Sequence, residues 1–107
     1  MYRVEILPIA RRDLVDVALY IAQKLKNPDA AEKFLNQFES RISSLSSMPY
    51  RRRSYVPLAS LEHEYRAVDV GNYLAFYWVE EEPEQVVTIA RVLFVRSNYA
   101  RTLGAEG

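Results

Sequence analysis

The fold is decided by residues 64–95, which read EYRAVDV-GN-YLAFYWV-EEEPEQ-VVTIARVLFV. Three runs rich in β-branched and aromatic residues are separated by two turn signals, a pattern that predicts an antiparallel meander. Gly71 adopts a positive φ without steric cost and Asn72 tolerates one, so the first turn suits a tight hairpin. Pro83 lies in the second turn, where its missing N–H costs no ladder hydrogen bond.

The middle run, residues 73–79, is apolar or aromatic throughout. A strand with one face in water alternates apolar and polar side chains, so this run predicts a strand that is covered on both faces. Helices can cover one face. Because little sequence is left to cover the other, we expect a large apolar patch there that a second chain buries.

The residues before the meander predict one strand and two helices. Residues 2–7 alternate as a short strand does, and Pro8 suits the first turn of a helix. Apolar residues then recur at helical spacing over 10–25 and again over 31–45. Between them we expect Asp29 to cap the second helix, with Glu32 completing a capping box.

The sequence therefore predicts an α+β fold in the order β-α-α-β-β-β. A helical hairpin packs on one face of a small, mainly antiparallel sheet, and the pairing of the first strand is left open. We expect residues 1–103 to form a single domain, with 104–107 as a frayed tail.

Composition restricts the kinds of protein this chain can be. Its net charge is 0 and it has no cysteine, so it lacks both the basic footprint of a dedicated nucleic-acid binder and a thiolate metal site. We expect no metal and no cofactor. No apolar run is long enough for a membrane span and no signal pattern opens the chain, which predicts a cytoplasmic protein without membrane contact.

Several short motifs appear in a characteristic order. A Tyr-Arg pair starts the second strand, the hairpin reads Gly-Asn-Tyr-x-x-Phe-Tyr-x-Val, and the last strand reads Ile-x-Arg-Val-Leu. In this order and spacing, over residues 2–103, the chain resembles the RelE/ParE superfamily, the toxins of bacterial type II toxin–antitoxin pairs. The resemblance implies a role in plasmid stabilisation and a toxin–antitoxin hetero-oligomer with a cognate ParD/RelB-like antitoxin.

Two activities occur in that superfamily. RelE-like members cut messenger RNA on the ribosome, whereas ParE-like members inhibit DNA gyrase. Leu74 replaces an arginine of the RelE-like pattern, Phe94 replaces a common histidine, and the C-terminal segment looks closer to the ParE ending. RNA cleavage needs a general base and acid, yet the only histidine, His63, precedes the second strand. We therefore expect a ParE-like gyrase inhibitor; a ribosome-dependent endoribonuclease and a degenerate toxin that only binds its antitoxin are the alternatives.

The resemblance also assigns residues to roles. The predicted target-binding residues are Arg51, Arg52, Arg53, Arg91, Arg96, Asn98, Tyr99 and Arg101. The predicted antitoxin-binding residues are Tyr73, Phe76, Trp78 and Leu93. If the protein is a ribonuclease, the catalytic residues are Arg66, Arg91 and Tyr99.

Structural roles compete with these assignments. Arg51 to Arg53 also suit a solvated loop, and Arg66 a charge on an edge strand that prevents aggregation. Arg91 is expected on one face with Val87, Ile89 and Leu93, as a functional cation or as the partner of a carboxylate such as Glu5. We expect Tyr99 either to stack on a base or to cover the core. The aromatic residues of the run 73–79 either form a stacking platform for bases or belong to the core and a partner interface.

Overall fold

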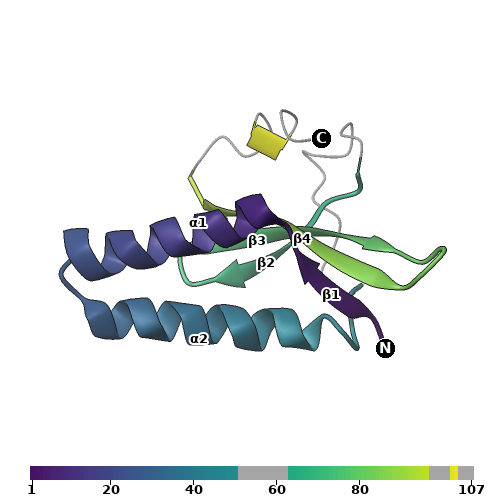
Figure 1. Ribbon diagram of the computed structural model, residues 1–107, viewed down its shortest axis with the longest axis horizontal. Coiled ribbons are helices and arrows are strands. Elements are labelled where there is room, and N and C mark those ends of the chain that lie inside the picture. Colours follow the sequence, from purple (N-terminus) through teal and green to yellow (C-terminus); the bar gives the residue numbers. More distant parts are fainter. Residues whose placement is uncertain (51–62, 97–101, 104–107) are drawn as a thin grey trace.

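The computed structural model describes residues 1–50, 63–96 and 102–103. Its elements are β1 (Arg3–Ile6), α1 (Pro8–Leu19), the π-helical turn η1 (Tyr20–Lys24), α2 (Pro28–Ser44), β2 (Arg66–Val70), β3 (Tyr73–Glu80) and β4 (Val86–Phe94). The helices form a hairpin beside a small sheet (Figure 1). This confirms the predicted α+β class and element order, while the expected frayed tail, 104–107, lies outside the described residues.

The sheet has four strands in the order β1-β4-β3-β2. The last three strands form the predicted meander, with Gly71 at φ 60° in its first turn. β1 pairs in parallel with the first half of β4, which answers the question that the sequence left open. The Leu7 N–H continues this pairing to the Ile89 carbonyl at 3.0 Å, after which the chain turns into α1.

The cap of α2 differs from the prediction. Asn27, not Asp29, is the N-cap, and its side-chain oxygen accepts a hydrogen bond from the Ala30 N–H at 3.0 Å. Pro28 occupies the first helical position, where a missing N–H costs nothing. Because proline starts the helix, the capping role moves to the residue before it, and Asp29 lies inside the first turn.

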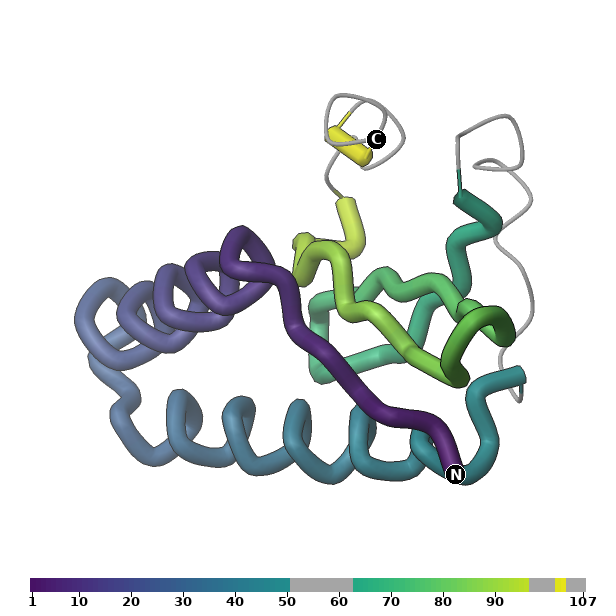
Figure 2. Tube along the Cα trace, turned by 45° about the vertical axis from the view of Figure 1, so that its right-hand side comes forward, coloured from purple at the N-terminus to yellow at the C-terminus, as the bar shows by residue number. Residues whose placement is uncertain are grey.

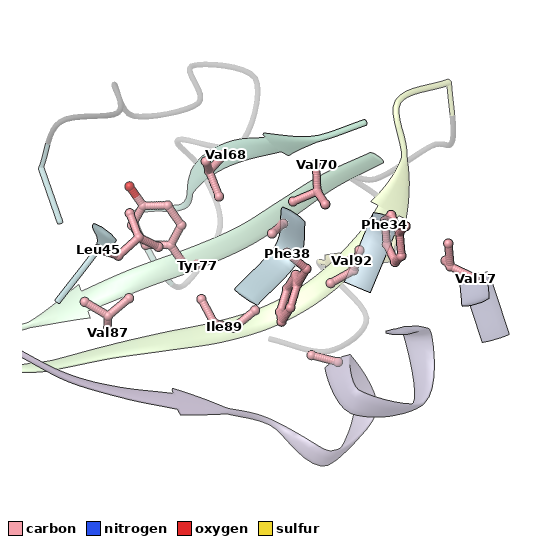
Figure 3. Packing of buried hydrophobic residues seen from close by; sticks show 12 residues of the cluster. Val17, Phe34, Phe38, Leu45, Val68, Val70, Tyr77, Val87, Ile89 and Val92 are labelled. Atoms are coloured by element: carbon pink, nitrogen blue, oxygen red, sulfur yellow. The ribbon is translucent and has the colours of Figure 1, made fainter. Parts of the chain in front are cut away.

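The main core lies between the helical hairpin and one face of the sheet. Phe34 and Phe38 of α2 pack with side chains from the three meander strands, among them Val70, Tyr77 and Ile89 (Figure 3). Every second side chain of β3 belongs to this core, so one face of β3 is buried by the chain's own helices.

The other face of the sheet is also covered, contrary to the expectation of a large exposed patch. Phe76 is 0% exposed and belongs to a second buried cluster with Tyr65, Leu74, Ala90 and Leu103. The turn that carries Leu103 lies on the opposite side of the sheet from α2 in two views (Figures 1 and 2). The chain therefore covers both faces of β3 itself, and a second chain is not needed to bury the aromatic strand.

Candidate functional site

A β-bulge in β4 changes the face to which Arg91 belongs. Phe76 pairs with Arg91, but the next residue of β3, Tyr77, pairs with Ile89, so Ala90 is one extra residue. The extra residue reverses the alternation, which places Val92 on the helix face together with Ile89. The prediction that Arg91 shares a face with Val87 and Ile89 was therefore wrong, since strict alternation holds only in a strand without a bulge.

The Arg91 guanidinium is held by a carboxylate of α1. Its Nε donates to Asp13 Oδ2 at 2.8 Å and its Nη2 donates to Asp13 Oδ1 at 3.0 Å, a bidentate geometry. The Val92 N–H also donates to Asp13 Oδ2, at 2.9 Å. The two charged side chains are only 13% and 12% exposed, so solvent screens this pair little.

This arrangement corrects the expected partner of Arg91. Glu5, the carboxylate named from sequence, instead pairs with the exposed Arg3 at 3.1 Å. Asp13 lies close because α1 runs beside the second half of β4, beyond the point where β1 stops pairing with it. Its carboxylate thereby satisfies an N–H at the open edge of β4, a function that periodicity does not reveal.

A second polar cluster joins Tyr2, before β1, and Tyr50, in the segment after α2, to the turn between β3 and β4. The Glu81 carboxylate accepts hydrogen bonds from the Tyr2 hydroxyl at 2.7 Å and from the Tyr50 hydroxyl. The hydrogen bond with Glu81 raises the pKa of Tyr50 to about 12, with smaller effects from burial and from the Glu81 charge. Hydrogen bonds from Tyr50 and then Tyr2 lower the pKa of Glu81. Glu81 therefore stays ionised and Tyr50 stays neutral at physiological pH, so this pair is a structural junction and not a poised acid and base.

Arg66, the predicted cation of the second strand, lies beside this junction. Its guanidinium carbon is 4.9 Å from the centre of the Tyr50 ring, a cation–π distance, and its Nη2 is 3.8 Å from a Glu64 oxygen. The side chain is 15% exposed. β2 is an edge strand, as the structural alternative for Arg66 requires.

The second face of the sheet carries an aromatic stack. The His63 ring lies parallel to the Trp78 ring with centroids 3.7 Å apart, and Tyr65 meets both rings edge-on. The Trp78 Nε1–H is buried and has no hydrogen-bond partner among the described residues. His63 thus covers an aromatic side chain of the sheet.

The predicted antitoxin-binding residues do not share one surface. Phe76, Trp78 and Leu93 belong to the second face, where Phe76 is fully buried. Tyr73 belongs to the helix face, where its ring lies edge-on to Phe34 with centroids 5.4 Å apart. Tyr73, Phe76 and Trp78 lie in β3 and Leu93 lies in β4, and an apolar run does not by itself separate the two faces of a strand.

Most of the predicted target-binding residues lie outside the described residues. These are Arg51, Arg52, Arg53, Asn98, Tyr99 and Arg101. Arg96 is described and exposed, directly after β4. Arg91 is described but held by Asp13, and the structure does not bring it together with Arg66, which lies on the edge strand at Tyr50.

Sequence reasoning missed an apolar groove between the tip of the helical hairpin and the sheet. It has a volume of about 410 Å³ and is lined by η1, α2, the β2–β3 turn and the end of β4. Three of the residues that line it, Tyr20, Leu25 and Phe94, are large hydrophobic side chains that remain exposed. Tyr73 forms part of its wall, with its ring 5.5 Å from that of Phe94.

The groove depends on η1. The Leu25 N–H bonds to the Tyr20 carbonyl at 3.1 Å, five residues back, which is the wide spacing of a π-helical turn. The chain then reverses through Lys26 at a φ of 52°. Periodicity assigned Leu25 to the buried helical face, but the wider turn changes the direction of its side chain, and Leu25 is 56% exposed at the groove.

Within residues 1–50, 63–96 and 102–103, no group of three or more carboxylate or imidazole side chains is placed to hold a metal ion. In the same ranges, neither helix has both the length and the apolar character of a membrane span. The described polar sites are thus ion pairs and hydrogen-bonded junctions.

Comparison with known proteins assigns the chain to a family. The family described as "ParE toxin of type II toxin-antitoxin system, parDE" matches residues 4–99. A solved structure described as "Chromosomal ParDE TA system from P. aeruginosa" has the same fold, with a TM-score of 0.69 and 19% identity over 90% of this chain and 98% of that one. No curated protein matches the chain. The chain therefore belongs to the ParE family of type II toxin–antitoxin toxins, the branch of the RelE/ParE superfamily that its hairpin and last strand indicated.

Proposed function

We propose that this chain inhibits DNA gyrase and is neutralised by a cognate antitoxin of the ParD/RelB type, with which it forms a hetero-oligomer. Its family membership, established over residues 4–99, supports a toxin of this class. The solved relative in the same fold comes from a ParDE system, which supports an antitoxin as the partner. Such a pair acts in the cytoplasm, where gyrase and DNA are found, and serves plasmid stabilisation.

The ion pair between Arg91 and Asp13 is the observation that favours gyrase over messenger RNA as the target. A ribonuclease needs cations free to stabilise a phosphate and a group that can move a proton. Arg91 is instead bound in bidentate fashion by Asp13 at 2.8 and 3.0 Å. The only histidine, His63, is stacked on Trp78. Arginine stays charged in proteins and is a poor proton donor or acceptor, so these residues do not form a hydrolytic cluster.

The proposed gyrase contacts are the residues after β4, namely Arg96, Asn98, Tyr99 and Arg101, together with Arg51, Arg52 and Arg53. Arg96 supports this choice because it is exposed at the end of β4. Arg91 acts indirectly: its pair with Asp13 fixes the second half of β4 against α1.

Induction of the chain alone in bacteria tests this function. We expect filamentation, the SOS response and altered plasmid supercoiling while translation continues. Arg96→Ala should reduce this toxicity. Arg66→Ala should leave it unchanged, because Arg66 contacts Tyr50 and is not one of the proposed gyrase contacts. Cut messages and prompt translation arrest that Arg66→Ala abolishes would establish the ribonuclease instead. No growth defect would indicate a degenerate toxin.

A further inference from the structure

The polar side chains that line the apolar groove are two tyrosines, two amides and one lysine. Lys33 is the only charged residue among the described residues that line the groove, and no carboxylate there pairs with it. Burial, and then the neighbouring Tyr20, raise the pKa of Tyr73, so its hydroxyl remains a neutral donor. The groove thus offers an apolar floor and a cationic rim.

The groove also collects exposed apolar surface that the fold does not bury. Tyr20 and Leu25 come from the π-helical turn and Phe94 from the end of β4, and each is among the large hydrophobic residues that remain exposed. A concave apolar surface of about 410 Å³ with a few polar groups is within the size range of specific binding sites. By contrast, the second face of the sheet buries its aromatic centre within the chain itself.

We propose that this groove receives an antitoxin segment that places one or two large apolar side chains on the floor and a carboxylate beside Lys33. This inference rests on the proposed function for the identity of the partner. Charge complementarity determines the chemistry of the segment, because the described residues of the lining include one cation, Lys33, and no acid. The half-open shape suits the side chains of a polypeptide laid across the surface.

The test uses the full chain and the full-length product of the reading frame beside its gene, with affinity measured by isothermal titration calorimetry. Leu25→Ser should weaken binding about tenfold, since it removes an apolar contact at the floor. Val15→Ser is the matched control: Val15 and Leu25 are both 56% exposed and both lie on the helical hairpin, but Val15 does not line the groove. We expect it to bind as the unmodified chain does.

Charge variants test the proposed contact between Lys33 and a carboxylate of the antitoxin segment. Lys33→Glu should weaken binding at least tenfold and Lys33→Gln by less, with both effects decreasing in high salt. Lys24→Glu is the control, a lysine of the same hairpin that is not part of the lining. Thermal unfolding of each variant shows that it is folded before binding is measured.

The outcomes separate the two proposals. If the unmodified chain binds and the groove variants bind equally well, the groove assignment is wrong while the antitoxin proposal stands. If the unmodified chain does not bind, both fail. If light scattering shows that the chain alone is a dimer and that Leu25→Ser makes it a monomer, the groove is a self-interface and the assignment is also overturned.

Discussion

Asp13 of α1 and Arg91 of β4 form a bidentate ion pair at 2.8 and 3.0 Å, and the same carboxylate accepts the Val92 N–H at 2.9 Å. One side chain therefore neutralises a nearly buried cation and satisfies the open edge of β4. The pair joins the helical hairpin to the strand that leads into the proposed gyrase-binding segment.

Asp13→Asn should lower the free energy of unfolding by about 3 kcal/mol, because it leaves the Arg91 guanidinium nearly buried without its counter-charge. Denaturant unfolding measures this effect. Asp16→Asn, an exposed position on the same helix, should change stability by less than about 0.5 kcal/mol. Equal effects of the two substitutions would show that the pair contributes nothing beyond an ordinary surface charge.

Phe76→Ala should destabilise the isolated chain by about 3–5 kcal/mol, since Phe76 is fully buried on the second face of the sheet. The control Leu35→Ala, at an exposed position of α2, should cost far less. We also expect the unmodified chain to be a folded monomer without its partner, as sedimentation would show. A small effect of Phe76→Ala together with exposed apolar surface, detected by dye binding, would restore the original expectation of an uncovered face.

The Tyr50–Glu81 hydrogen bond should produce a pH dependence of stability. The pKa of Tyr50 is raised to about 12 from its ordinary value of 10.0. Between these values the unfolded chain loses the proton that the folded chain keeps, so this contribution is complete below pH 10 and is lost as the pH rises through 12. Stability measured against pH should decrease less over this range in Tyr50→Phe and Glu81→Gln than in the unmodified chain. If the stability of both variants decreases with rising pH as steeply as that of the unmodified chain, the proposed contribution of the Tyr50–Glu81 hydrogen bond is wrong.

Fluorescence of Trp78, the only tryptophan, reports on the second face. His63 is stacked on its ring at 3.7 Å, so His63→Ala should expose the indole and shift its emission to longer wavelength. His63→Phe is the matched variant, because another flat ring can keep the stack and the emission. The stack would be disproved if the two variants gave the same spectrum as the unmodified chain.

The sequence was sufficient to predict the class and order of elements, because each element carries a local signal: alternation in β1, helical spacing in α1 and α2, and Gly71 in the hairpin. The cap of α2 was misplaced by two residues because Pro28 and Asp29 both suit a helix start. The coverage of the second face depends on Leu103, which is distant from β3 in sequence, and on Tyr65, which precedes β2; neither gives a periodic signal.

The candidate site was less predictable. Arg91 was named from sequence, but its partner Asp13 is 78 residues away, and the bulge at Ala90 that determines its face has no sequence signal in a run of apolar residues. The groove arises from the π-helical turn at Tyr20–Lys24, which periodicity read as ordinary α-helix. Long-range contacts and local departures from regular geometry thus account for what sequence reasoning missed.

A supercoiling assay with purified DNA gyrase, plasmid DNA and this chain is the most direct test of the central claim, that the chain inhibits gyrase. We expect the chain to inhibit supercoiling and trap cleaved DNA, with prior addition of the antitoxin abolishing both effects and Arg96→Ala weakening them. Full gyrase activity in the presence of folded chain, combined with cleavage of messenger RNA on added ribosomes, would contradict the account.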